Sequence, residues 1–191
     1  MVFDALDFLR NQLANSQLAP VGFINNVAVR NIQREGEPVN NAADNNVYVT
    51  LVNIEEEKHL RGQAPHYHFQ SADQYLLLNP MLNLNLYVLF SAYCAQYTEA
   101  LKCIQYVIRF FQSRNVFENI PNVNNPTIEK LMLELQSQTL DQNASMWQQL
   151  GGRYVPSVLY KARLVSILEI PNNADSGTVV TEIGMNIQIK P

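Results

Sequence analysis

A change of hydrophobic period between Leu82 and Phe111 constrains the fold of this chain more than any other feature. In its first part every second residue is apolar, which gives an extended strand one face to bury: Leu82, Leu84, Leu86, Val88, Phe90 and Ala92. The spacing then becomes helical, and one face of the predicted helix carries Tyr97, Leu101, Ile104, Ile108 and Phe111. Because the turn between the two is very short, we expect the helix over 96–113 to fold back across the strand's own sheet.

The rest of the chain interleaves further helix and strand patterns. We expect helices at 2–14 and 140–150, the second ending at Gly151-Gly152. Strands are expected at 22–32, 47–54, 76–94, 128–138, 157–170 and 178–189. The segments 33–46 and 115–127 are interpreted as polar connections, and 55–69 is expected to leave the core.

Residues 128–138 allow two interpretations. Leu131, Leu133 and Leu135 alternate as in a strand, whereas the local content of Glu, Lys, Leu and Met favours a helix. We prefer the strand. The whole pattern then predicts an α/β (α+β) fold over 1–191, a single domain in which a mixed sheet is covered on one face by the helices of 2–14 and 96–113.

Charge and composition narrow the function classes. A net charge of −4 with scattered basic residues argues against a nucleic-acid-binding surface. Only 16% of residues are charged, and the Asn- and Gln-rich surface that this implies is consistent either with subunit contacts or with a biased genome composition. No Sec-type signal peptide and no membrane-spanning run is recognisable, so a cytoplasmic protein with reduced Cys94 and Cys103 is expected.

Residues that could carry chemistry do not form a convincing site. His59, His66 and His68 are close in sequence, and Glu55, Glu56 and Glu57 could add oxygen ligands, but no HExxH motif or cysteine pair completes a metal site. Gly151-Gly152 lacks the spacing of a phosphate-binding loop, and a helix stop explains it. We therefore expect no catalytic residues, no metal and no cofactor, with a small metal-dependent enzyme as the less favoured alternative.

The C-terminal strand is the best candidate for binding. It alternates over 178–189, and its apolar residues include Ile183, Met185, Ile187 and Ile189. A strand of this kind can complete its own sheet or pair with the sheet of a neighbouring subunit.

Five segments resemble a known family when taken together: FDALDFLRNQL at 3–13, VTLVNIEEEKHLR at 49–61, NLNLYVLFSAYCAQYTEALKCIQYVIRFFQ at 83–112, IEKLMLELQSQTL at 128–140 and WQQLGGRYVPSVLYKARL at 147–164. They are similar to the conserved domain of cap, or tail-terminator, proteins of contractile injection systems, which are phage-tail-like particles. The resemblance implies a structural protein with a tail-terminator-like fold and no enzymatic activity.

What the resemblance further implies is a homohexameric ring at the distal end of the tube and sheath, which ends their polymerisation. Its partners would be other copies of the chain, the inner tube protein, the sheath protein and, in some systems, a second cap protein. A cap adaptor and a phage tail terminator are the alternatives. Assembly in the cytoplasm would be followed by incorporation into an extracellular or membrane-anchored particle. The surface positions that match the family, Glu55, Glu56, Glu57, Arg153, Tyr154 and Lys161, are candidate interface residues.

Overall fold

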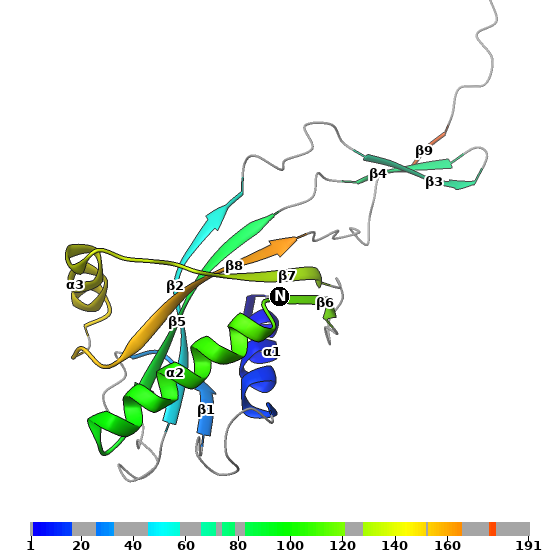
Figure 1. Cartoon of the computed structure of the whole chain (residues 1–191). Coiled ribbons are helices and arrows are strands. Elements are labelled where there is room, and N and C mark those ends of the chain that lie inside the picture. Colours follow the sequence, from blue (N-terminus) through cyan, green and yellow to red (C-terminus); the bar gives the residue numbers. More distant parts are fainter. Residues whose placement is uncertain are drawn as a thin grey trace, which may run out of the picture.

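The computed structural model describes residues 2–16, 26–32, 46–57, 66–71, 74–78, 83–120, 128–151, 153–165 and 176–178. This part of the chain forms three helices and nine strands (Figure 1). In chain order they are α1 (Val2–Ala14), β1 (Asn26–Val29), β2 (Asn46–Glu56), β3 (His66–Ser71), β4 (Gln74–Leu78), β5 (Leu84–Tyr93), α2 (Tyr97–Ser113), β6 (Val116–Ile120), β7 (Ile128–Leu135), α3 (Leu140–Gln149), β8 (Ser157–Val165) and β9 (Ser176–Thr178). None of the described helices is long and apolar enough to cross a membrane.

A six-stranded sheet of order β1-β2-β5-β8-β7-β6 forms the body of the protein. β1 runs parallel to β2, and the other neighbours are antiparallel, so the sheet is mixed as predicted. Between Leu51 and Asn53 the register of β2 on β5 shifts by one residue. Such a bulge adds a residue to one strand and changes the direction of its side chains.

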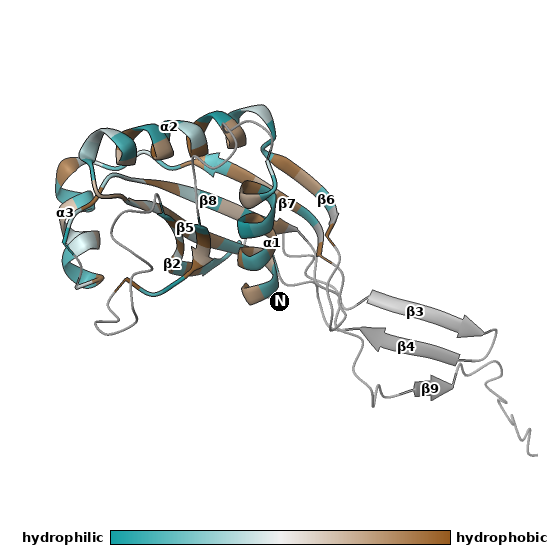
Figure 2. Ribbon diagram, turned by 90° about the horizontal axis from the view of Figure 1, so that it is seen from below, coloured by the Kyte–Doolittle hydropathy of each residue, from teal (hydrophilic) through white to brown (hydrophobic). Residues whose placement is uncertain are grey.

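Helices α1 and α2 cover one face of this sheet (Figure 2). The alternating residues of β5 predicted to be buried lie in this core, apart from Leu82, which falls outside the described residues: Leu84, Leu86, Val88, Phe90 and Ala92. At its centre the ring of Phe111 from α2 lies 5.0 Å from that of Phe90 on β5 and 5.2 Å from that of Tyr160 on β8. The prediction that the helix folds back across its own sheet is therefore confirmed.

The prediction of which face of α2 is buried was wrong at the N-terminal end of the helix. Tyr97 and Leu101 are 65% and 46% exposed, whereas Ala100, Cys103 and Val107 are buried. A spacing of three and four residues is satisfied by two adjoining stripes, and the stripe with the smaller residues allows the helix to approach the sheet closely.

The segment 115–127 is not a polar connection throughout. Val116–Ile120 forms β6 at the edge of the sheet, and its Phe117 and Ile120 are buried. The ring of Phe117 contacts that of Phe8 in α1 edge to face, with 5.3 Å between the ring centroids. The sequence pattern did not predict this packing of β6 against α1. Only two apolar residues of this short strand reach the core, too few to establish a period.

The C-terminal half follows the predictions more closely. β7 is a strand, not a helix, and it places Leu131 and Leu133 in the core, although Leu135 is 55% exposed. The short helix is α3, which begins with a capping box between Thr139 and Gln142. It is followed by Gly151 with a φ of 61°, a backbone conformation that favours glycine.

A second, three-stranded antiparallel sheet has the order β3-β4-β9. It corrects one prediction, because the expected strand 76–94 is divided between β4 and β5, which belong to different sheets. Residues 66–71, within and just after the polar stretch expected to leave the core, form strand β3 of this second sheet. β8 accounts for the described part of the predicted strand 157–170, whose remainder lies outside the described residues. Of the predicted strand 22–32, residues 30–32 are not in β1, and 22–25 lie outside the described residues.

Candidate assembly surface

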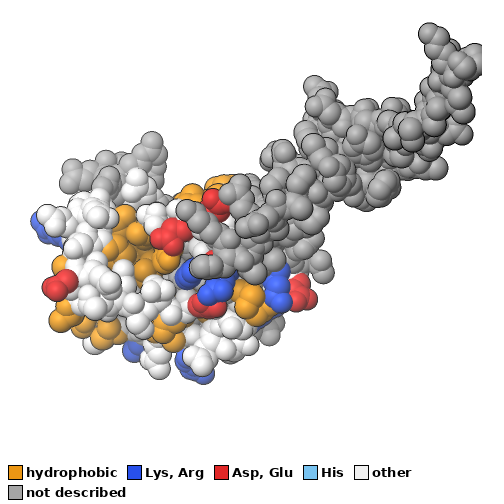
Figure 3. Space-filling model, turned by 90° about the horizontal axis from the view of Figure 1, so that it is seen from above, with side chains coloured by type: hydrophobic (Ala, Val, Ile, Leu, Met, Phe, Trp, Pro, Cys, Tyr) orange, Lys and Arg blue, Asp and Glu red, His pale blue; other side chains and the backbone are white. Residues whose placement is uncertain are grey.

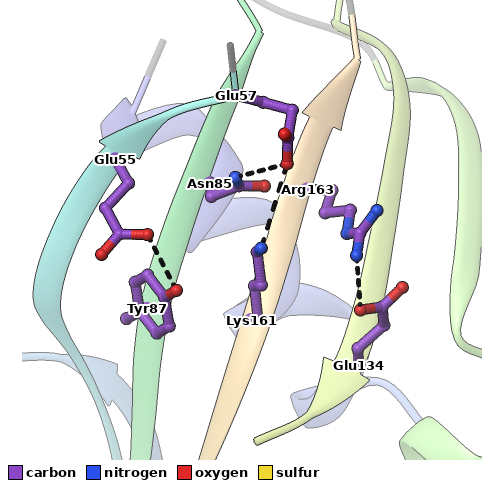
Figure 4. Close-up of polar contacts among 7 residues, drawn as sticks. All are labelled: Glu55, Glu57, Asn85, Tyr87, Glu134, Lys161 and Arg163. Atoms are coloured by element: carbon purple, nitrogen blue, oxygen red, sulfur yellow. Dashed lines mark hydrogen bonds and ion pairs between the residues drawn. The ribbon is translucent and has the colours of Figure 1, made fainter. Parts of the chain in front are cut away.

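The sheet face opposite α1 and α2 carries both an apolar cluster and a row of charged side chains. Near α3, a second small core is formed by Leu89, Met146, Trp147 and Leu159. Beyond it the strands present polar residues in neighbouring positions (Figure 4): Glu55, Glu57, Asn85, Tyr87, Glu134, Lys161 and Arg163. Figure 3 shows acidic and basic side chains grouped beside apolar ones.

Register explains how these charges come together. Tyr87 on β5 is opposite Lys161 on β8, which in turn is opposite Glu134 on β7. Asn85 is opposite Arg163 in the same way. Since residues two apart on a strand share a face, all five side chains lie on one side of the sheet.

Ion pairs and hydrogen bonds connect this row. Glu57 accepts a hydrogen bond from Asn85 Nδ2 at 2.9 Å, and its Oε2 lies 3.9 Å from Lys161 Nζ. Arg163 Nη2 donates to Glu134 Oε2 at 3.1 Å. Glu57 and Lys161 are the more protected pair, with side chains only 16% and 18% exposed. These contacts tie β2, β5, β8 and β7 together across the sheet.

Glu55 has a different environment from Glu57. Its Oε2 accepts a hydrogen bond from the Tyr87 hydroxyl at 2.9 Å, and its Oε1 accepts one from Asn53 Nδ2 at 3.3 Å. Burial and the hydrogen bond to the Glu55 carboxylate raise the pKa of Tyr87 above its usual value. The tyrosine is therefore a neutral hydrogen-bond donor that orients Glu55 at the rim of the sheet.

The structure brings together only some of the predicted interface residues. Glu55, Glu57 and Lys161 share the charged face, but Glu56 is opposite Leu84 in the register and so lies on the side of α1 and α2. Arg153 and Tyr154 are in the connection between α3 and β8, and both are exposed. Ile183, Met185, Ile187 and Ile189 lie outside the described residues.

Tyr154 lines an apolar cavity of about 530 Å³ where α2 begins. Tyr97 also lines it, together with Tyr93, Cys94, Val155 and Pro156. Tyr154 is 62% exposed, and its ring is 5.8 Å from that of the buried Trp147. Tyr97 was predicted on the buried face of the helix, so its place on the surface was not expected from the sequence.

The two cysteines meet beside this cavity. Cys94, directly after β5, has its Sγ 3.8 Å from the Sγ of Cys103 in α2, and both are free thiols. Burial raises the pKa of both thiols, that of Cys103 to about 12. At neutral pH these are unreactive, protonated groups, consistent with the expected role as core residues.

The histidine segment forms part of the second sheet. His66 and His68 are on β3, opposite Leu78 and Leu76 of β4. His59 lies outside the described residues. Among the residues that the structure describes, no group of three His, Cys, Asp or Glu side chains is arranged to hold a metal ion.

Comparison with known proteins identifies the fold. The family model described as the Pvc16 N-terminal domain matches residues 6–182. One similar solved structure is the PVC sheath/tube terminator of an extracellular contractile injection system in its extended state, with a TM-score of 0.64, 17% identity, and 100% of this chain covering 64% of that one. Another is the anti-feeding prophage cap, a tube terminating cap, with a TM-score of 0.60, 15% identity, and 97% of this chain covering 60% of that one.

These identities establish a shared fold, and this chain spans less than two thirds of the length of either structure. Among curated protein sequences, none matches it. The family model nevertheless covers most of the residues, and the fold is that of the terminators. This chain therefore belongs to the Pvc16 N-terminal domain family.

Proposed function

We propose that this protein is a structural cap of a contractile injection system, which forms a sixfold ring on the last layer of tube and sheath and ends their polymerisation. The observation that carries the proposal is the match of the entire chain to a sheath/tube terminator, together with the family assignment over 6–182. Its partners would be other copies of itself, the inner tube protein and the sheath protein. The particle would be extracellular, as the similar terminator's is.

The surface supports an assembly role without turnover. Exposed Tyr97 and Tyr154 flank an apolar cavity, which is a typical setting for an interface anchor. Glu55, Glu56, Arg153 and Tyr154 are proposed to contribute to contacts between subunits. Lys161 and Glu57 are proposed to act on the charged face that they share with Glu55, where their mutual contact joins β8 to the end of β2.

We propose in addition that the segment 178–189 pairs with a neighbouring subunit, while the chain remains one domain. Support comes from its alternating sequence and from its position directly after β9, an edge strand of the β3-β4-β9 sheet. An edge strand has unpaired backbone groups that another chain can use.

Mass photometry of the chain, alone and mixed with its cognate tube and sheath proteins, tests the function. A species of six subunits, and tubes whose length becomes limited when the chain is added, are the expected results. Binding only to a separate cap protein would point to an adaptor instead. A monomer that leaves tube length unchanged would overturn the proposal.

A further inference from the structure

A groove lies between the sheet and α3. It encloses about 660 Å³ and is lined by residues of β2, β5, α3, β8 and the connection from β7 to α3. Apolar side chains line part of it: Val52, Met146 and Leu159. Amide and hydroxyl groups line much of the rest: Asn53, Gln136, Ser137, Gln138, Gln142, Ser145 and Gln149. We call it the α3 groove.

Charge in the α3 groove is of one sign. Among the described residues that line it, the charged ones are Glu55 from β2 and Asp141 from α3, and both are acidic. The neighbouring charged row is balanced, because Glu57 faces Lys161 and Glu134 faces Arg163. In the part of the chain that the structure describes, Glu55 and Asp141 form no ion pair. Among the described acids of this face, Glu57 and Glu134 are therefore ion-paired, whereas the two acids of the groove are not.

The Glu55 carboxylate is also preorganised. Tyr87 and Asn53 each donate one hydrogen bond to it, which fixes its direction but uses only two of its roughly four acceptor positions. A fixed, partly satisfied carboxylate loses little side-chain entropy when a cation binds, so it binds more favourably than a free one. Asp141, in the first turn of α3, complements the helix dipole and likewise has acceptor positions available.

We propose that the α3 groove receives an extended basic segment of a sheath or tube subunit, with Lys or Arg side chains on Glu55 and Asp141 and aliphatic side chains over Leu159 and Val52. The choice of a protein partner follows from charge complementarity and from the apolar residues that line the same groove as the acids. A strand-like segment alternates its side chains between two sides, so it can present basic and apolar side chains to a groove lined by both acidic and apolar residues. The inference rests on the proposed function for the identity of the partner.

Overlapping 15-residue peptides that cover the cognate sheath and tube proteins provide the probe. The immobilised peptides are incubated with the purified full-length chain in about 0.1 M and about 0.5 M salt, since exposed charges are strongly screened at the higher concentration. Bound peptides are expected to be rich in Lys and Arg, and their binding is expected to fall at least about tenfold with salt.

The double variant Glu55→Gln/Asp141→Asn is expected to lose at least about tenfold in binding. Its matched control is Glu99→Gln/Glu118→Gln, which removes the same charge from α2 and β6 and should bind as the unmodified chain does. Any of three results would overturn the groove proposal. These are an equal loss of binding in both variants, binding of peptides that lack basic residues, and the absence of any bound peptide. Mass photometry of the unmodified chain separates the two proposals, because an unmodified chain that forms rings but binds no peptide rejects only the groove.

Discussion

At the scale of single residues, distance and burial give opposite rankings of the ion pairs. Lys102 lies only 2.9 Å from Glu99, but its side chain is 58% exposed. Lys161 is 3.9 Å from Glu57, yet both side chains are less than a fifth exposed, and Glu57 also binds Asn85. Removing one partner of a protected pair leaves the other charge poorly solvated, which destabilises the folded chain. An exposed ion pair contributes little to the free energy of unfolding, so its removal costs little.

We therefore predict that Lys161→Ala lowers the free energy of unfolding by about 1–2 kcal/mol, and Lys102→Ala by less than about 0.5 kcal/mol. Urea unfolding of the two variants at neutral pH measures the difference. Equal losses would mean that Lys161 is better solvated in solution than its exposed fraction suggests.

The buried thiol of Cys103 predicts a loss of stability at alkaline pH. Its pKa is raised from 9.0 to about 12, so the folded chain holds the proton more tightly than the unfolded chain does. The resulting stabilisation is complete below pH 9 and is lost as the pH rises from about 9 towards 12. At pH 10.5 the loss amounts to about 2 kcal/mol, relative to pH 8.

Urea unfolding at pH 8 and pH 10.5 measures this loss. In Cys103→Ala the pH dependence should be smaller by about the same 2 kcal/mol, although burial also raises the pKa of Tyr160 to about 12 and leaves a smaller slope of the same sign. An identical pH dependence of the unfolding free energy in the unmodified chain and in Cys103→Ala would contradict this prediction. It would show that ionisation of the Cys103 thiol does not destabilise the folded chain.

At the scale of elements, a helix or strand could be predicted from the sequence where one hydrophobic period continues over many positions. β5 and β7 were recognised because alternate residues face one core, and in β7 this pattern outweighed local helix propensity. β6 could not be recognised, since its burial depends on α1 and in particular on Phe8. The exposure of Tyr97 depends on where the sheet ends beneath α2, which no local pattern contains.

The capping box makes α3 a good test of element stability. Gln142 N–H donates to Thr139 Oγ1 at 3.3 Å, and Thr139 N–H donates to Gln142 Oε1 at 3.0 Å. We predict that Thr139→Ala costs about 1 kcal/mol by removing the side-chain acceptor for a free helical N–H.

Trp147, the only tryptophan, is buried in α3, so its fluorescence during urea unfolding reports on this helix directly. Thr98→Ala on the exposed side of α2 is the control, because it removes a threonine from a helix without affecting a cap. A loss with Thr98→Ala as large as with Thr139→Ala would contradict the role of the capping box.

At the scale of the whole molecule, the described helices are divided unequally between the two faces of the main sheet. α1 and α2 complete the main core on one face, while α3 packs on one end of the other. Sequence reasoning identified the acids of β2 and the residues after α3 as surface candidates. It could not show that Glu55 and Asp141 line one groove, or that Tyr97 and Tyr154 line one cavity, because those meetings are made by the tertiary fold.

The cavity leads to a prediction about assembly. Tyr97 and Tyr154 are both more than half exposed beside an apolar cavity of about 530 Å³, an arrangement that suits insertion of an apolar side chain from another subunit.

In Tyr97→Ser/Tyr154→Ser we expect the melting temperature to change little, because neither ring belongs to the main core. If the cavity lies between subunits, the fraction of rings seen by mass photometry should fall at least about tenfold, because a loss of about 1.4 kcal/mol lowers the equilibrium constant of each subunit contact tenfold. Phe3→Ser, which removes another exposed aromatic ring on α1, is the control for a general effect of surface hydrophobicity. Unchanged ring formation in the double tyrosine variant would show that the cavity faces away from the subunit contacts.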